Sequence, residues 1–187
     1  MGVIGVLVSG SGTNLQALLD EGLPVMAVGS NRRGVRALAR AREAGVPARV
    51  FEVSWHASRV DRDLAMADWL ATRGVELVVC AGYMQLLTPP FLERFTAINV
   101  HPSLLPSFPG TRAVEEALAA GVVETGATVH FVDEGVDTGA VIAQEAVPVL
   151  PGDTPETLHA RIQRVERRLL PEAARLFLTG GLRSRFP

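Results

Sequence analysis

Lysine is absent from this sequence of 187 residues, and all 18 of its basic residues are arginines. A phosphate-binding loop of the Walker A type requires a lysine, and so does the Schiff base that anchors pyridoxal phosphate. The missing lysine therefore excludes both kinds of site.

Cysteine and long apolar runs are also scarce. The single cysteine, Cys80, cannot form a disulfide within the chain. No apolar run approaches the roughly 18 residues of a membrane-spanning helix, and the N-terminus lacks the pattern of a signal peptide. The net charge of -2 and the pI of about 6.1 give no reason to expect a nucleic acid or an anionic membrane as a partner. We therefore expect a cytoplasmic protein with one domain over residues 1–187.

Motifs that would identify a metal site or a serine nucleophile are missing as well. The 4 histidines are His56, His101, His130 and His159, and none of them lies in a His-x-His, His-x-x-Glu-His or Cys/His cluster. This pattern predicts no metal site. A Gly-x-Ser-x-Gly elbow is also absent.

Short apolar runs alternate with longer amphipathic segments along the chain. The apolar runs predict strands at Val3–Val8, Val25–Gly29, Arg49–Val53, Leu77–Ala81 and Ala97–Val100. The amphipathic segments between them predict helices at Asn14–Glu21, Val35–Ala44, Arg59–Thr72 and Pro89–Arg94. Near-continuous apolar strands separated by helices indicate an α/β fold, with a doubly wound, mostly parallel sheet between two helical layers.

The C-terminal part follows a different pattern. A helix is expected at Ala113–Ala120, and the β-like runs Thr128–Val132 and Val141–Val149 are joined by only a short loop. So short a connection predicts an antiparallel hairpin that extends the sheet. A last helix is expected over residues 155–178.

A glycine-rich loop, SGSGTN, joins the first predicted strand to the first predicted helix. Backbone N–H groups converge in such a loop, and the helix dipole favours an anion there. A dinucleotide is not the favoured ligand, because Leu15 stands where the fingerprint needs a third glycine or alanine. A phosphomonoester fits better, although the same residues also suit a plain βα turn with Thr13 or Asn14 as the helix N-cap.

The stretch INVHPSLLPSFPG, residues 98–110, places two polar side chains at the end of a strand. Asn99 and His101 point the same way, because strand side chains alternate between the faces of a sheet. Such a pair is suited to donating hydrogen bonds to a developing oxyanion. His130 is interpreted as a structural residue of the sheet, and His56 and His159 suggest no role.

The loop VDEGVDTGAVI, residues 132–142, offers a carboxylate for His101. Its acids are Asp133, Glu134 and Asp137, and Asp137 stands among small residues just before an apolar strand. An aspartate beside a histidine favours the imidazolium and fixes the orientation of the ring. Asn99, His101 and Asp137 together predict acyl or formyl transfer through a tetrahedral intermediate, with no nucleophile from the protein.

The loop after the fourth predicted strand, residues 82–87, is mostly apolar. Met84, Leu86 and Leu87 could line a slot for a flat aromatic ring at the carboxyl end of the sheet, where ligands of doubly wound folds bind. They would serve equally well as core residues beneath a loop, and this alternative stays open.

The motifs SGSGTNLQAL, NVHPSLLPSFPG and GATVHFVDEGVDTGAVIAQ occur in an order that resembles the glycinamide ribonucleotide formyltransferases of purine synthesis. The resemblance runs essentially from end to end. It implies the formyltransferase fold, with a Rossmann-like N-terminal half that binds the nucleotide and a C-terminal half that mainly binds folate. It also implies transfer of a formyl group from the co-substrate 10-formyltetrahydrofolate to the amine of glycinamide ribonucleotide, without a metal.

The resemblance implies roles for individual residues. Asn99 and His101 would stabilise the oxyanion, while Asp137 would orient His101, hold it charged and help a water relay to move the amine proton. The residues implied for the ribonucleotide are Gly12, Thr13, Asn14 and Glu166. Those implied for the folate are Arg59, Met84, Gln85, Leu86, Leu87 and Asn99, with the backbone of Asp133, Glu134, Gly135, Val136 and Asp137.

Two positions depart from that family. Gln85 replaces a basic residue that many members carry, which could weaken contact with the anionic tail of the folate. Val114 replaces a common histidine, with Arg112 two residues earlier. The resemblance therefore does not imply the details of substrate contact in the loop around Val114.

Three other functions compete with this expectation. A formyltetrahydrofolate hydrolase usually carries an N-terminal regulatory domain, for which we expect no room before the first strand. A methionyl-tRNA formyltransferase would need a further C-terminal domain and a basic face. A non-catalytic nucleotide-binding module would not need the Asn99, His101 and Asp137 set. We expect two small-molecule substrates as partners, and a monomer or a homodimer.

Overall fold

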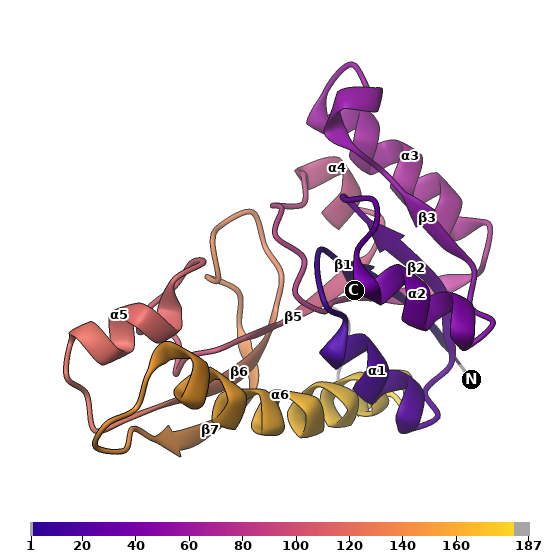
Figure 1. Cartoon of the computed structure of the whole chain (residues 1–187). Helices are drawn as coiled ribbons and strands as arrows, with labels where there is room; N and C mark the ends of the chain where they lie inside the picture. Colours follow the sequence, from indigo (N-terminus) through magenta and orange to yellow (C-terminus); the bar gives the residue numbers. More distant parts are fainter. Residues whose placement is uncertain (1, 182–187) are drawn as a thin grey trace.

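A seven-stranded sheet with the order β3-β2-β1-β4-β5-β6-β7 runs through the molecule (Figure 1). The computed structural model describes residues 2–181. The strands are β1 (Val3–Val8), β2 (Val25–Ser30), β3 (Ala48–Val50), β4 (Val75–Cys80), β5 (Thr96–His101), β6 (Glu124–Phe131) and β7 (Val141–Pro148). Strands β1 to β5 are parallel, whereas β6 pairs antiparallel with both β5 and β7. The predicted mostly parallel sheet with an antiparallel extension is confirmed.

Helices cover both faces of the sheet (Figure 1). The helical elements are α1 (Thr13–Asp20), α2 (Arg36–Glu43), the 3-10 turn η1 (Val53–Trp55), α3 (Arg59–Ala71), α4 (Pro89–Leu92), α5 (Ala113–Ala119) and α6 (Pro155–Leu178). Apolar side chains of α1, α2, α5 and α6 form one core with the sheet, and those of α3 and α4 form a second core on the opposite face. Among the described residues, no helix combines the length and the apolar composition that a membrane crossing would take.

The central strands are apolar on both sides because both of their faces are covered. In β1, the side chains of Ile4 and Val6 belong to the core beneath α1 and α6, whereas Leu7 belongs to the core beneath α3. Side chains of β1 point alternately into one core and the other, so neither side of the strand faces water and none of its residues is polar.

Most predicted strands agree with the structure to within two residues at each end, and two differ by more. The strand expected at Arg49–Val53 is β3, which covers only Ala48–Val50, because it lies at the sheet edge and pairs with β2 over just those residues. The strand expected at Thr128–Val132 begins earlier, at Glu124, because β6 forms a ladder with β7 from Glu124 onwards. Both differences come from strand pairing, which a local sequence pattern does not encode.

Candidate active site

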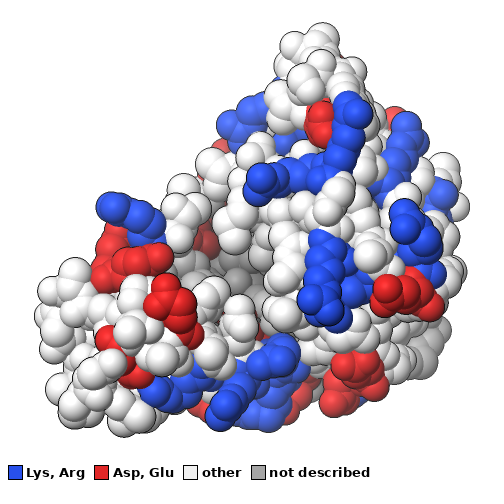
Figure 2. Space-filling view, in the orientation of Figure 1, with Lys and Arg blue, Asp and Glu red and all other residues white. Residues whose placement is uncertain are grey.

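A cavity of about 600 Å³ opens at the carboxyl ends of the parallel strands, where ligands of such folds bind. It is lined by the glycine-rich loop, the loop after β4, the end of β5, the start of α5, the loop between β6 and β7, and the first turns of α6. Figure 2 shows the cavity as a hollow near the middle of one face, with arginines along its right and lower edges. This volume is large enough to hold two small molecules side by side, and not only a single ion.

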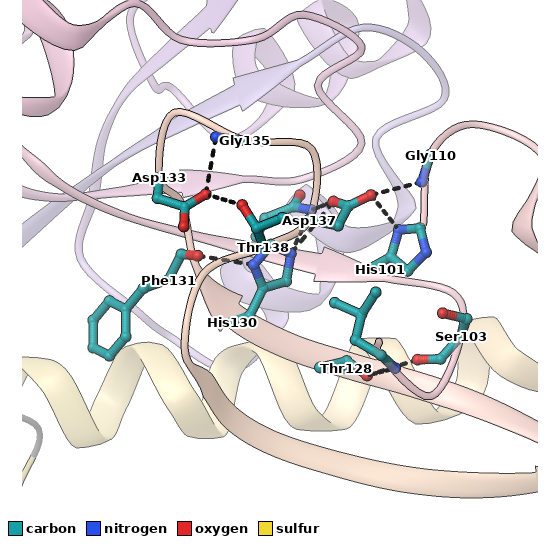
Figure 3. Close-up of polar contacts among 12 residues, drawn as sticks. His101, Ser103, Gly110, Thr128, His130, Phe131, Asp133, Gly135, Asp137 and Thr138 are labelled. Atoms are coloured by element: carbon teal, nitrogen blue, oxygen red, sulfur yellow. Dashed lines mark hydrogen bonds and ion pairs between the residues drawn. The ribbon is translucent and has the colours of Figure 1, made fainter. Parts of the chain in front are cut away.

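Asp137 is the centre of a polar cluster on the wall of this cavity (Figure 3). One of its oxygens, Oδ2, lies 3.3 Å from His101 Nδ1 and accepts a hydrogen bond of 2.8 Å from the Gly110 N–H. The other oxygen, Oδ1, lies 3.5 Å from both His130 Nε2 and Asn99 Nδ2. The structure therefore brings together the three residues that the sequence singled out for catalysis.

The carboxyl group of Asp137 is held in its ionised form. Burial by itself would raise its pKa, but hydrogen bonds from His130 and from the Gly110 N–H, with the charges of His101 and His130, lower it below the ordinary value of 3.8. A permanent negative charge thus faces the imidazole of His101 at neutral pH.

His101 is buried, and both of its ring nitrogens face oxygen atoms. Nε2 lies 2.8 Å from the carbonyl oxygen of Phe108, and because a carbonyl only accepts, Nε2 must be the donor. Nδ1 faces the Asp137 carboxylate, with Oδ2 at 3.3 Å. Nε2 is held by Phe108 at 2.8 Å, whereas Nδ1 lies at the longer distance of 3.3 Å from Asp137, so Nδ1 is the nitrogen that a substrate oxygen can more readily engage.

The two residues that fix the ring of His101 both have left-handed backbone conformations. Phe108 has a φ of 53° and Asp137 a φ of 54°. Aspartate tolerates this region, but a bulky residue such as phenylalanine rarely adopts it, and such strain costs about 1–3 kcal/mol. Strain of this kind is concentrated at functional sites, because the surrounding structure must hold a geometry that the chain does not prefer.

His130 is a buried, hydrogen-bonded residue of the sheet, as the sequence indicated, and it also belongs to this cluster. It lies in β6 directly opposite Asn99 of β5. Its Nδ1 donates to the Phe131 carbonyl at 2.8 Å, and its Nε2 lies 3.2 Å from Asn99 Nδ2. Nε2 therefore accepts from the Asn99 amide when the ring is neutral and donates to Asp137 when the ring is protonated. In the neutral form His130 orients the amide of Asn99.

The glycine-rich loop and α6 also line the cavity. Gly12, with a φ of 73°, is the N-cap of α1, and no side chain caps this helix. The expectation of Thr13 or Asn14 as the N-cap is therefore wrong, since both residues lie within the first turn. The Asn14 side chain instead donates a hydrogen bond of 3.1 Å to Glu166 Oε2 on α6.

Glu166 is a buried carboxyl group. Burial raises its pKa above the ordinary 4.5, although the hydrogen bond from Asn14 and the charges of His159 and Arg167 act in the other direction. His159 and Gln163 line the cavity on the same face of α6 as Glu166. Neither residue was expected at the site from the sequence, but residues 159, 163 and 166 have the i, i+4, i+7 spacing of one helix face, which is the signal that points to them.

The loop after β4 presents an apolar surface to the cavity. Met84 is 59% exposed and Leu86 43% exposed, and both line the cavity. Leu87 lines the cavity as well but is buried in the core beneath α3. Met84 and Leu86 thus match the expected apolar slot, whereas Leu87 matches the alternative of a core residue beneath the loop.

Helix α3 supports this loop from behind. Arg59 donates to the Leu86 carbonyl at 3.1 Å. Arg62 is fully buried, forms an ion pair of 2.6 Å with Asp63, and donates to Gln85 Oε1 at 3.2 Å. Asp63 in turn accepts from the Thr88 N–H at 2.8 Å. The position that departs from the family pattern, Gln85, is thus in contact with a buried arginine.

The remaining residues expected at the folate site divide into two groups. Asp133, Gly135 and Val136 line the cavity, as does Gln85. Arg59 and Glu134 do not line it, and Arg59 reaches the site only through the Leu86 backbone.

Val114 lines the cavity, whereas Arg112 pairs with Glu116 on α5 at 3.6 Å. Within residues 2–181, no group of three or more His, Cys, Asp or Glu side chains is arranged to hold a metal ion.

Comparison with known proteins gives consistent matches. The family model described as formyl transferase matches residues 3–174. The phosphoribosylglycinamide formyltransferase of Mycobacterium tuberculosis (strain CDC 1551 / Oshkosh) is 48% identical over 184 residues, which are 95% of this chain and 85% of that protein. The trifunctional purine biosynthetic protein adenosine-3 of Drosophila pseudoobscura pseudoobscura is 46% identical over 96% of this chain, which spans only 14% of that protein.

Among solved structures, the glycinamide ribonucleotide transformylase 1 of Symbiobacterium toebii has a TM-score of 0.95 and 50% sequence identity, covering 100% of this chain and 92% of that chain. The phosphoribosylglycinamide formyltransferase of Streptococcus pneumoniae TIGR4 has a TM-score of 0.91 and 40% identity, covering 95% of this chain and 99% of that chain. Fold and sequence thus agree over nearly the whole chain.

Proposed function

This chain belongs to the formyl transferase family, and on that premise we propose that it transfers the formyl group of 10-formyltetrahydrofolate to the amine of glycinamide ribonucleotide. The products are N-formylglycinamide ribonucleotide and tetrahydrofolate, in a step of purine synthesis. One observation carries the proposal: Asn99 and the Asp137–His101 ion pair line the same cavity as the glycine-rich loop.

The ribonucleotide is held at the glycine-rich loop and α6. The N–H groups at the start of α1 bind the phosphate, because unpaired N–H groups and the helix dipole both favour an anion. The buried Glu166 accepts hydrogen bonds from hydroxyl groups of the nucleotide, and the hydrogen bond from Asn14 keeps its carboxyl group in place. These contacts leave the amine free to extend towards Asn99 and His101.

The residues on the other side of the cavity fit the folate. Met84 and Leu86 provide exposed apolar surface for a flat ring, and the backbone of residues 132–137 provides polar groups along its edge. Arg59 and Arg62 hold the loop that carries this apolar surface.

The reaction forms one bond and breaks another. The amine of the ribonucleotide attacks the formyl carbon, a new C–N bond forms, and the bond between that carbon and N10 of the folate breaks. A proton leaves the amine and reaches N10 by a water relay beside Asp137. The protein supplies no nucleophile.

The chain contributes mainly electrostatic stabilisation. Negative charge develops on the formyl oxygen, where Asn99 Nδ2–H donates to it and His101 Nδ1–H is shared between it and Asp137 Oδ2. Asp137 balances the charge of His101 and, with Phe108, holds its ring in place. One preorganised donor of this kind contributes a factor of roughly 10²–10³ to the rate.

The decisive experiment incubates the protein with 10-formyltetrahydrofolate, with and without glycinamide ribonucleotide, and follows the release of tetrahydrofolate. Release that requires the amine is the expected result. Release without the amine would favour a formyltetrahydrofolate hydrolase instead. Binding of the ribonucleotide with no release at all would favour a non-catalytic nucleotide-binding module.

We also propose that the protein acts in the cytoplasm, as a monomer or a homodimer, with these two small molecules as its partners. Sedimentation analysis with and without the substrates distinguishes the two assembly states. A larger assembly would contradict this part of the proposal.

A further inference from the structure

Helix α2 contacts the glycine-rich loop through two consecutive backbone carbonyls. The Ala37 N–H donates to the Gly10 carbonyl at 3.1 Å. The Arg40 guanidinium donates through Nε to the Ser11 carbonyl at 3.0 Å, and through Nη1 to Gln16 Oε1 at 2.8 Å. Arg40 therefore links the loop to the helix that follows it.

These contacts determine where the N–H groups of the loop point. In a trans peptide, the carbonyl of one residue and the N–H of the next point in opposite directions. Because the carbonyls of Gly10 and Ser11 point towards α2, the N–H groups of Ser11 and Gly12 point away from it. Within residues 2–181, no protein group accepts a hydrogen bond from the N–H of Ser11, Gly12 or Thr13, and all three residues line the cavity.

The loop packs closely against α2. A Cβ atom added to Gly12 would lie 2.7 Å from the Ala37 Cα and 3.3 Å from the Arg40 Cδ. The Gln16 amide is itself held, because its Nε2 donates to Asp20 Oδ1 at 2.8 Å, which leaves Oε1 for Arg40. Arg40 is thus the cationic part of a closely packed contact behind the loop.

We propose that Arg40 is a positioning residue for the phosphate site. It fixes the Ser11–Gly12 peptide so that the Gly12 N–H is directed at the phosphate, and it places a positive charge behind that peptide without touching the substrate. This inference rests on the proposed function, since that function supplies the phosphate-bearing substrate.

The matched control is another arginine on the same helix. Arg42 is exposed, and it makes no side-chain hydrogen bond or ion pair with the described residues. Arg42→Met removes the same charge as Arg40→Met without breaking a hydrogen bond or an ion pair. Arg40→Lys keeps the charge but lacks the planar pair of donors that bridges the Ser11 carbonyl and Gln16.

The experiment measures kcat and KM of the four proteins with glycinamide ribonucleotide, and with its dephosphorylated riboside. For Arg40→Met we expect a KM for the ribonucleotide about tenfold higher, which corresponds to about 1.4 kcal/mol, with kcat unchanged. The kcat/KM for the riboside should match that of the unaltered protein. The KM of Arg40→Lys for the ribonucleotide should lie between those of the unaltered protein and Arg40→Met. The KM of Arg42→Met should equal that of the unaltered protein.

Two outcomes would overturn the inference. An equal loss on both substrates would mean that Arg40 only supports the fold. An equal rise in KM for Arg42→Met would mean that only the long-range charge of α2 matters.

Calorimetric titration with ribose 5-phosphate separates this inference from the proposed function. Weaker binding by Arg40→Met than by Arg42→Met is expected whether or not formyl transfer is observed. Equal binding by these two variants would refute the positioning role. Absence of formyl transfer by the unaltered protein would refute the proposed function alone.

Discussion

Replacement of Asp137 by asparagine tests the polar cluster most directly. Asparagine has nearly the same shape and also tolerates the left-handed φ of 54° at this position, so the backbone should be retained. The variant loses the negative charge that faces His101 and His130. Its amide also brings an N–H₂ group to a place where the Gly110 N–H, the Asn99 amide and a protonated His101 are all hydrogen-bond donors.

The magnitude follows from the geometry of the ion pair. When His101 is protonated, the unit charges 3.3 Å apart at His101 Nδ1 and Asp137 Oδ2 attract by about 5 kcal/mol at an effective dielectric constant of 20, and by about 1 kcal/mol in water. The side chains are 4% and 13% exposed, so the first value is the closer one, reduced by the cost of burying the charges. A net loss of about 3 kcal/mol corresponds to a decrease in kcat of roughly 10²-fold or more.

The assay is steady-state formyl transfer, with substrate affinities measured separately by calorimetry. We expect kcat to fall by that factor while both affinities stay within about threefold of the original. Asp68→Asn, which removes an exposed carboxylate from α3, is the control and should keep full activity. A kcat near that of the unaltered protein in Asp137→Asn would refute the role assigned to the ion pair.

Three further predictions concern other parts of the site. Because the pKa of Glu166 is raised above 4.5, its ionisation destabilises the fold as the pH rises through the folded-state pKa. Glu166→Gln should therefore raise the Tm at pH 7, by about 2–4 °C for each kcal/mol gained in the free energy of unfolding, and leave the Tm unchanged below pH 4.5, as measured by scanning calorimetry. The same substitution should raise the KM for the ribonucleotide. Gly12→Ala should lower the Tm more than Gly22→Ala. Both positions have a positive φ, but only at Gly12 would the added Cβ collide with backbone, at the Ala37 Cα. Equal losses in Tm would contradict this collision. Gln85→Leu leaves an Arg62 donor unpaired and should raise the KM for 10-formyltetrahydrofolate about threefold to tenfold, with no change in the KM for the ribonucleotide.

The fold was predictable where the physical cause is local. Burial on both faces makes β1 a continuous apolar run, and a short connection forces β6 and β7 to be antiparallel. The placement of Asn99 and His101 at the end of β5 was predictable for the same reason, because side-chain direction in a strand follows from its period of two.

Other features depend on contacts between distant segments. The contact of His130 with Asn99 requires the register of β5 against β6, which neither strand encodes alone. The left-handed conformation of Phe108 is imposed by the tertiary structure against the local preference of the residue. The support of Gln85 by the buried Arg62 likewise becomes visible only when α3 is placed beneath the loop.

The hydrogen bond between Asn14 and Glu166 joins positions that are 152 residues apart in the sequence. During synthesis on the ribosome, the first strand and helix emerge long before α6 exists, so the nucleotide site is incomplete on the nascent chain. Closing so long a separation is entropically costly and slow compared with forming local helices. Recovery of ribonucleotide binding after dilution from denaturant should therefore lag behind recovery of helical circular dichroism, which makes catalytic activity a reporter of completed folding.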